Sequence, residues 1–167
     1  GPLALTGDPG FLVVLAGLGI AAVGATLGAL ASAVPGREDE ARLALRSGLA
    51  GLALACAGGV WVTLDAGPAT AELALGDSVS CLVRASLLGL APAIIAWAFL
   101  SRTVPRRPYA GVAASAVCAV ALGAMLVHAT CRAEDPLHML LGHSLAPLWV
   151  ALAVTLPLGF AISKKRG

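Results

Sequence analysis

Long apolar runs separated by short polar segments dominate the chain. Five such blocks of about 21–25 residues occur, and each is long enough to cross the ~30 Å hydrocarbon core of a bilayer as a helix with some tilt. No strand-like alternation competes with this pattern, and open strands would leave backbone groups unpaired in lipid. We therefore expect an all-α, polytopic transmembrane helix bundle that forms a single integral membrane domain over residues 1–167. The five spans are predicted at about 11–34, 43–64, 79–100, 109–129 and 139–163.

The composition supports a membrane location. Hydrophobic residues make up 59% of the chain and charged residues 12%, with a mean hydropathy of +0.91. Soluble domains average about 45–50% apolar and about 25% charged residues, so a water-soluble globule and a disordered tail are both excluded. The first block follows a start whose one charge is Asp8, and it exceeds the 7–15 apolar residues of a signal peptide. We therefore expect a span here and not a cleaved signal.

Basic residues gather on one side of the predicted bundle. Nine of them flank the spans on that side, whereas the other side holds Arg132 and most of the acidic residues. Loops rich in Lys and Arg stay in the cytoplasm. The pattern therefore predicts an N-terminus outside and a cytoplasmic C-terminus. The nine residues are Arg37, Arg42, Arg46, Arg102, Arg106, Arg107, Lys164, Lys165 and Arg166.

The side chains capable of chemistry lie near the opposite, outer side. Two thiols and all three imidazoles of the chain fall at the outer ends of spans three, four and five. Thiolate and imidazole ligands suit zinc, copper and other soft or borderline ions, and two thiols outside the cytoplasm can also form a disulfide. A third interpretation is structural, with small apolar cysteines and interfacial histidines. The residues concerned are Cys81, His128, Cys131, His138 and His143.

The spacing of these residues matches no recognised metal motif. His138 and His143 are five residues apart, and on an ideal α-helix that spacing points them about 140° away from each other. Cys56 and Cys118 lie in mid-span and are expected to pack as small apolar side chains. Arg84 lies one turn inside span three. Its side chain is expected either to lie beside the Cys81 thiol or to extend to the outer membrane interface.

The chain also carries an ordered set of features. They are, in order, Ala33-Val-Pro35-Gly36 after a span, Cys81 opening a span, the basic loop Arg102-Thr-Val-Pro105-Arg-Arg-Pro108, Gly111 in a small-residue helix, Cys131 with Glu134-Asp135, and His143 in the last span. In this order the set resembles the NrsF family of bacterial membrane anti-sigma factors, which are negative regulators of an extracytoplasmic-function sigma factor. The resemblance extends over nearly the whole chain.

The resemblance has functional implications. In that family two periplasmic cysteines are implicated in sensing stress such as toxic metals, and the matching positions are Cys81 and Cys131. It further implies a sigma-factor partner on the cytoplasmic side of the bacterial inner membrane, surrounded by lipid, and no direct binding of nucleic acid. Family members resemble six-span proteins with a short cytoplasmic N-terminal segment. The chain is therefore expected to lack that segment and the first span.

Three functions are compatible with the sequence. The leading hypothesis is a non-enzymatic negative regulator that senses metal or redox stress, requires no cofactor, and holds a zinc, copper or other heavy-metal ion at the outer residues. The alternatives are a small transporter or channel-like subunit and a haem- or metal-dependent enzyme subunit. The last is disfavoured because all the histidines lie near one interface. Arg102, Arg106 and Arg107 form the candidate contact with the sigma factor, although anionic lipid would attract them as well.

Overall fold

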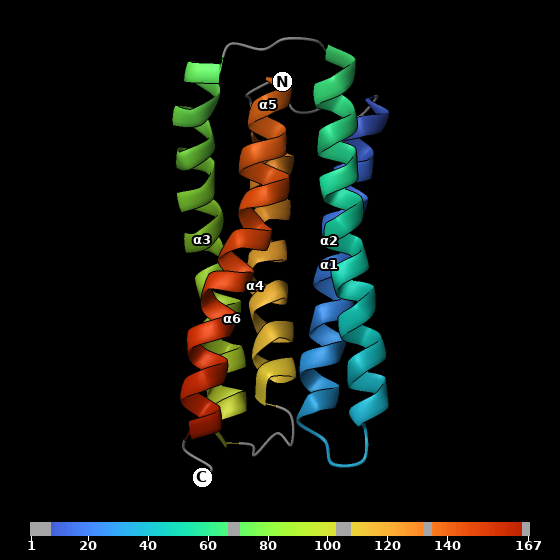
Figure 1. The fold of residues 1–167 in the computed structure, drawn as a ribbon, viewed down its shortest axis with the longest axis vertical. Coiled ribbons are helices and arrows are strands. Elements are labelled where there is room, and N and C mark those ends of the chain that lie inside the picture. The colour runs from blue at the N-terminus through green and yellow to red at the C-terminus, as the bar shows by residue number, and fades with distance from the viewer. Residues whose placement is uncertain (1–7, 67–70, 103–107, 132–134, 165–167) are drawn as a thin grey trace.

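The chain folds into long helices that run side by side along one axis (Figure 1). The computed structural model describes residues 8–66, 71–102, 108–131 and 135–164, and these contain helices and turns but no strand. The last three helices follow one another directly and form one continuous rod. The elements are α1 (Pro9–Ser32), α2 (Glu38–Ala66), α3 (Ala71–Arg102), α4 (Pro108–Thr130), α5 (Pro136–His138), the π-helix η2 (Met139–Leu145) and α6 (Ala146–Lys164).

Five of the helical rods are long and apolar enough to cross a membrane, by length and composition. This confirms the all-α class and the five predicted apolar helices. The first helix begins where the Asp8 side chain accepts a hydrogen bond from the Gly10 backbone N–H (2.8 Å), with Pro9 in the first turn. It ends at Ser32, two residues before the predicted limit, because the chain turns through Gly36 at a φ of 86°. Glycine adopts this conformation without a steric penalty.

Helix α4 lies at the centre of the bundle and organises the others. It packs against α1, α2, α3 and α6, and α1 packs against α2 along most of its length. The core between these helices consists of small and branched side chains, among them Val14, Leu18, Leu52 and Ala121, all at most 1% exposed. The α1–α2 connection, the end of α3, the start of α4 and the end of α6 lie at the same end of the bundle, which we call the C-terminal end (Figure 1).

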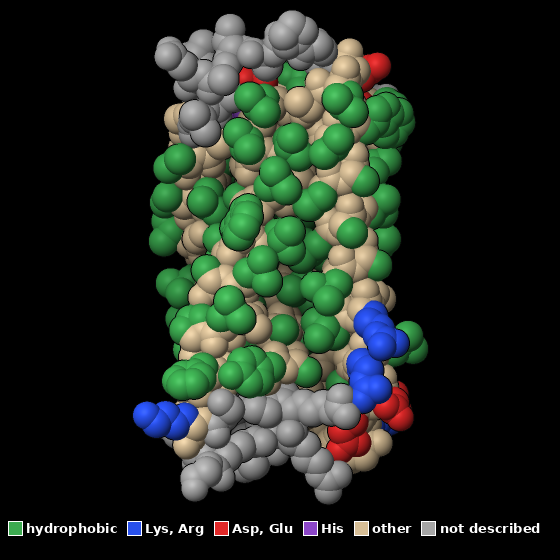
Figure 2. All heavy atoms as spheres, in the orientation of Figure 1, with side chains coloured by type: hydrophobic (Ala, Val, Ile, Leu, Met, Phe, Trp, Pro, Cys, Tyr) green, Lys and Arg blue, Asp and Glu red, His purple; other side chains and the backbone are tan. Residues whose placement is uncertain are grey.

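The outer surface of the bundle is apolar around its middle. On the face shown in Figure 2, hydrophobic side chains cover the middle of the bundle, and the charged side chains lie toward its two ends. Large residues such as Leu43, Leu87, Trp149 and Phe160 are 62–71% exposed. Apolar patches this extensive mark contact with a membrane or a partner. The charged residues described at the C-terminal end include Arg37, Arg42, Arg46 and Lys164.

Glycines allow α1 and α2 to approach closely. A Cβ atom added at Gly51 would lie 2.5 Å from the backbone nitrogen of Ala21 and 2.6 Å from the carbonyl oxygen of Gly17. Small residues at such positions let helix backbones pack directly against each other. By contrast, a Cβ atom at Gly19 would meet no heavy atom within 4 Å.

This difference gives a paired stability prediction. Gly51→Ala is expected to lower the free energy of unfolding by about 1–3 kcal/mol, because the added methyl group forces the two helices apart. Gly19→Ala should cost nothing and gain up to about 1 kcal/mol from the higher helix propensity of alanine. Reversible unfolding in detergent measures both variants, and equal effects of the two would contradict the packing described here.

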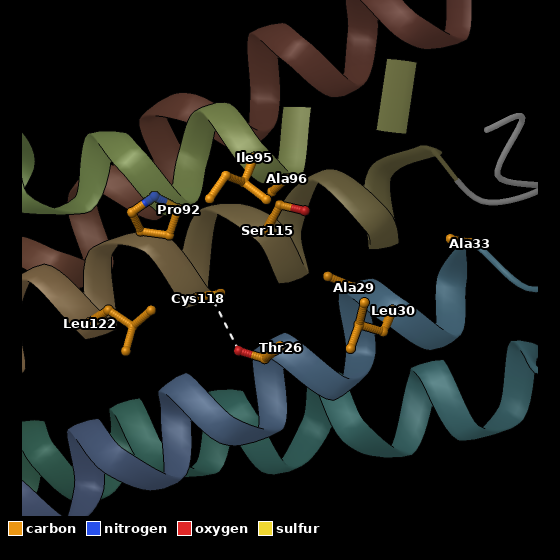
Figure 3. A pocket seen from close by; sticks show the side chains of 10 residues that line it. All are labelled: Thr26, Ala29, Leu30, Ala33, Pro92, Ile95, Ala96, Ser115, Cys118 and Leu122. Carbon is orange, nitrogen blue, oxygen red and sulfur yellow. Dashed lines mark hydrogen bonds between the residues drawn. The ribbon is translucent and has the colours of Figure 1, made fainter. Parts of the chain in front are cut away.

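A cavity of about 270 Å³ lies between α1, α3 and α4 (Figure 3). Within it the Cys118 thiol lies 3.0 Å from the Thr26 hydroxyl. Among the described residues, no charged side chain lines the cavity, and Cys118 therefore lies in an environment suited to packing. The lining residues are Thr26, Ala29, Leu30, Ala33, Pro92, Ile95, Ala96, Ser115, Cys118 and Leu122.

Candidate metal and thiol site

Four segments converge at the end of the bundle opposite the C-terminus, where α5 lies (Figure 1). Cys81 lies on α3, Cys131 directly follows α4, His138 closes α5, and His143 lies within η2. One ligand atom from each of these four residues can be chosen such that all four atoms lie within 4.8 Å of one another. We call these four residues the Cys₂His₂ cluster. Cys81 is 50 residues from Cys131, whereas the other three are separated by seven and five residues, so the packing of α3 against α4, α5 and η2 completes the cluster.

The two thiols lie in contact. The Sγ atoms of Cys81 and Cys131 are 3.6 Å apart, and no disulfide joins these two residues. Cys81 is buried, at 5% exposure, and Cys131 is half-buried. The backbone N–H of Cys131 donates to the carbonyl of Val127 (2.7 Å), so the last turn of α4 fixes its position. Two sulfur atoms at this separation can share a metal ion or be joined by oxidation.

The two imidazoles complete the cluster. The Nε2 atom of His138 lies 3.4 Å from the Cys131 sulfur and 3.0 Å from Nε2 of His143. Its other nitrogen, Nδ1, lies 3.3 Å from the Ser78 hydroxyl on α3. Histidine ligands of metals use one ring nitrogen for the ion and the other for an orienting hydrogen bond. Ser78 is therefore placed to orient His138.

Three of the six separations between ligand atoms lie near those of tetrahedral coordination. Zinc binds cysteine sulfur at about 2.3 Å and histidine nitrogen at about 2.0–2.1 Å, so neighbouring ligand atoms of a tetrahedral site lie about 3.3–3.8 Å apart. The cluster shows 3.6 Å between the sulfurs, 3.4 Å from sulfur to nitrogen and 3.0 Å between the nitrogens. The other three separations lie within 4.8 Å, so the ligand atoms need to move by about 1 Å or less to surround an ion.

A π-helix overturns the expectation that His138 and His143 point apart. Residues 139–145 form a π-helix, whose hydrogen bonds join residues five apart. The capping N–H of Ala146, for example, donates to the carbonyl of Leu141. As a result the two rings lie on one face, with centroids 4.9 Å apart. The predicted angle of about 140° assumed an α-helix, and this segment is not one.

His128 lies beside the cluster but outside it. Its Nε2 atom lies 3.1 Å from the backbone carbonyl oxygen of Phe11, and its ring stacks on the Phe11 ring at 4.3 Å. Its edge also contacts the His143 ring, with centroids 5.2 Å apart. The structure therefore brings together four of the five candidate ligands, and it engages the fifth with α1.

One buried nitrogen in the cluster is unsatisfied. Nδ1 of His143 has no hydrogen-bond partner, although the residue is 1% exposed. An unpaired buried polar atom costs about 1–3 kcal/mol. Buried polar groups without a structural benefit are typical of functional sites, where stability is sacrificed.

The other residues singled out in the sequence lie elsewhere. Asp135 caps α5 by accepting a hydrogen bond from the Leu137 backbone N–H (2.9 Å). Arg84 is exposed, whereas Cys81 is buried. Arg102 ends α3. The remaining candidates lie outside the described residues, namely Arg106, Arg107, Arg132, Glu134, Lys165 and Arg166.

Sequence reasoning missed the residues of α2 and α3 that support the cluster. Cys56, expected to pack, lies with its thiol 3.4 Å from the Ser144 carbonyl oxygen, toward which it donates. The Thr63 hydroxyl donates to the carbonyl of Pro136 (3.2 Å), and Gly59 leaves room for Ser144. Cys56 and Thr63 are seven residues apart and therefore share one face of α2, but one thiol and one hydroxyl in an apolar helix do not by themselves indicate a site. A usable signal was the pair of small residues, Gly142 and Ser144, on either side of His143, because small residues let neighbouring helices approach the histidine closely.

The arrangement defines a class of protein: an all-α bundle with five helices able to span a membrane and a thiol–imidazole cluster at one end. Comparison with protein families identifies it further. The chain belongs to the NrsF family, negative regulator of sigma F, whose model matches residues 3–161. No curated protein sequence and no solved structure matches the chain.

Proposed function

We propose that the protein is a membrane-embedded negative regulator of an extracytoplasmic-function sigma factor, and that it senses metal ions through the Cys₂His₂ cluster. Family membership supports the regulatory role. The observation that carries the sensing role is the convergence of four soft and borderline ligand atoms within 4.8 Å. Such a donor set selects zinc, copper or a heavier soft ion over magnesium or calcium. No catalytic step is part of this function.

The same thiols support a redox response. With sulfur atoms 3.6 Å apart, hydrogen peroxide can convert the pair to a disulfide, and the two electrons and two protons that the thiols lose reduce the peroxide to two water molecules. Oxidation removes both thiolate ligands, so metal binding and disulfide formation at Cys81 and Cys131 exclude each other. Both inputs change the same four-residue cluster.

The distribution of buried polar groups favours a sensor over a transport path. Among the described residues, the buried polar side chains are Ser78, Ser115, His128, His138, His143 and Ser144. All but Ser115 belong to the cluster or lie next to it. A path for ions or solutes needs polar groups distributed through the depth of the membrane, whereas these residues gather at one end.

The charge pattern supports an orientation with the cluster outside the cytoplasm of a bacterial inner membrane. Arg37, Arg42 and Arg46 lie near one end, as does Lys164, and the cluster lies at the other. An impermeant thiol reagent tests this in a variant whose native cysteines are serines. In intact cells it should label Asp65→Cys and not Asp39→Cys, both of which are exposed positions. Labelling of Asp39→Cys alone would reverse the orientation.

Contact with the sigma factor then falls on the C-terminal end of the bundle. Basic residues around Arg102, Arg106 and Arg107 offer an acidic partner a positive surface, on which anionic lipid headgroups compete. Electrostatic contacts of this kind weaken as salt is raised, because the Debye length shortens from about 10 Å at 0.1 M to about 3 Å at 1 M.

Co-purification tests the regulatory role. The chain, expressed together with its candidate sigma factor, should retain that factor through purification and release it when Cd²⁺ is added. A Cys81→Ser variant should retain the sigma factor with and without Cd²⁺. Recovery of no sigma factor from cells that express it would contradict the proposed function.

A further inference from the structure

The π-helix is an unusual element at a decisive position. Its seven residues, Met139–Leu145, lie between α5 and α6, which are α-helical. A π-helix accommodates an extra residue within an otherwise α-helical rod, and such segments occur frequently at functional sites. Here the extra residue falls between the two histidines of the cluster. Without it, the rod would be one uninterrupted α-helix.

Residues 139–145 can be wound as a π-helix or as an α-helix, and we call these two arrangements the π register and the α register. They place the side chains of His138 and His143 differently. In the π register, the Nε2 atoms of His138 and His143 are 3.0 Å apart. In an α register, a five-residue spacing would turn the two side chains about 140° apart. An ion or other group that bridges both imidazoles therefore binds the π register alone. A ligand with such differential affinity shifts the equilibrium between the registers.

The registers also differ at the far end of the rod. Converting the π segment to an α-helix turns every later residue by about 100° and advances it by about 1.5 Å. At that end Gly159 packs directly against the ring of Tyr109 on α4. After the turn, the residue one position earlier, Leu158, would come to the place of Gly159. Because even a Cβ atom there would overlap the Tyr109 ring, this partly exposed ring would have to move aside. The contact between α6 and α4 therefore reports the register.

Helix α6 is suited to such a rotation. From Ala146 to Ile162 its sequence is apolar except for Thr155. Its large residues Trp149, Leu156 and Phe160 are 62–68% exposed on the outside of the bundle. A helix that is apolar on all faces buries no charge when it turns within lipid.

Resting on the proposed function, we propose that a ligand bridging His138 and His143 holds the last span in its π register. Loss of this ligand lets residues 139–145 become α-helical. The change turns α6 at the opposite end of the bundle. The cluster on one face of the membrane then controls the orientation of the segment that reaches the other. The signal travels through one continuous rod.

A photo-cross-link at the far end tests the proposal on the full chain in lipid nanodiscs. With p-benzoylphenylalanine in place of Tyr109, cross-links should form with Gly159 when Cd²⁺ is bound. On removal of Cd²⁺ by a chelator, the yield of cross-link to Leu158 should rise by about tenfold, as expected for a two-state population shift. Peptide mass spectrometry identifies the partner, and thiolate-to-cadmium absorbance reports binding.

A single deletion provides the matched test. Deleting Leu141 places the histidines four residues apart, which puts them on one face of an ordinary α-helix. This variant should bind Cd²⁺ within about threefold of the wild type, because the ligand pair survives on one face, while its cross-link stays on the same α6 residue with and without Cd²⁺. Leu141→Ala removes the same side chain and keeps the chain length, so it should behave as the wild type does.

The outcomes separate the two claims. Cross-links in the wild type that do not change although Cd²⁺ binds would overturn the register proposal and leave the proposed function intact. Loss of Cd²⁺ binding in the deletion variant would also contradict the register proposal. A wild-type protein that binds no Cd²⁺ would overturn both. If the deletion variant does not fold, the wild-type cross-link decides the matter alone.

Discussion

Replacing Cys81 with serine is expected to abolish the response of sigma-factor-dependent transcription to metal ions and oxidants. A serine hydroxyl is a poor ligand for soft and borderline ions, and it forms no disulfide with Cys131. The affinity for Cd²⁺ should fall by more than about 100-fold, since even residues that only orient a ligand contribute 10–100-fold. A transcriptional reporter and a cadmium titration measure the two effects, and Cys131→Ser should reproduce both.

Cys118→Ser is the matched control for this prediction. Cys118 lies on α4 with its thiol beside the Thr26 hydroxyl, in the cavity between α1, α3 and α4. It is not part of the Cys₂His₂ cluster, so the response should be unchanged. A folded Cys81→Ser protein that responds to Cd²⁺ like the Cys118→Ser protein would remove the thiol pair from the mechanism.

His143→Leu is expected to separate metal binding from stability. The variant lacks one of the four ligands, so its affinity for Cd²⁺ should fall by more than about 100-fold, again beyond the range of an orienting residue. Its fold should be retained, because leucine fills a similar volume and removes the unsatisfied Nδ1 atom. That atom costs about 1–3 kcal/mol, whereas the lost hydrogen bond to His138 contributes about 0.5–1.5 kcal/mol. The free energy of unfolding should therefore stay level or rise slightly.

Leu52→Ala calibrates the stability measurement. Leu52 is 1% exposed in the core between the helices, and removal of such a side chain costs about 2–5 kcal/mol. This variant should unfold more easily while its cluster still binds Cd²⁺. If His143→Leu destabilised the protein as strongly as Leu52→Ala does, the histidine would be a structural residue of the core.

The helices could be predicted from the sequence because the bilayer imposes their length. An apolar run of about 20 residues has one stable arrangement in hydrocarbon, and the observed elements α1 and α4 begin and end within two residues of the expected limits. Helix α3 is longer than expected because it continues past the apolar run at both ends, from Ala71 to Arg102. Charge and apolar pattern locate the core of a helix and not its last turns.

The candidate site could be predicted only in part. The positions of Cys81, Cys131 and the histidines relative to the spans indicated one end of the bundle, but distances such as that between the two thiols arise from the packing of α3 against α4. The grouping of His138 with His143 could not be predicted, because it depends on one extra residue that the rod absorbs as a π-helix. Contacts from α2, such as that of Cys56 with the Ser144 carbonyl, surround that segment.

The coordination shell of bound zinc tests the account most directly. X-ray absorption of the zinc-loaded protein in lipid should show two sulfur ligands at about 2.3 Å and two nitrogen ligands at about 2.0–2.1 Å. In Cys118→Ser the shell should be unchanged, and in Cys81→Ser one sulfur should be lost. A shell of oxygen and nitrogen atoms without sulfur would contradict the assignment of Cys81, Cys131, His138 and His143 as the sensing site.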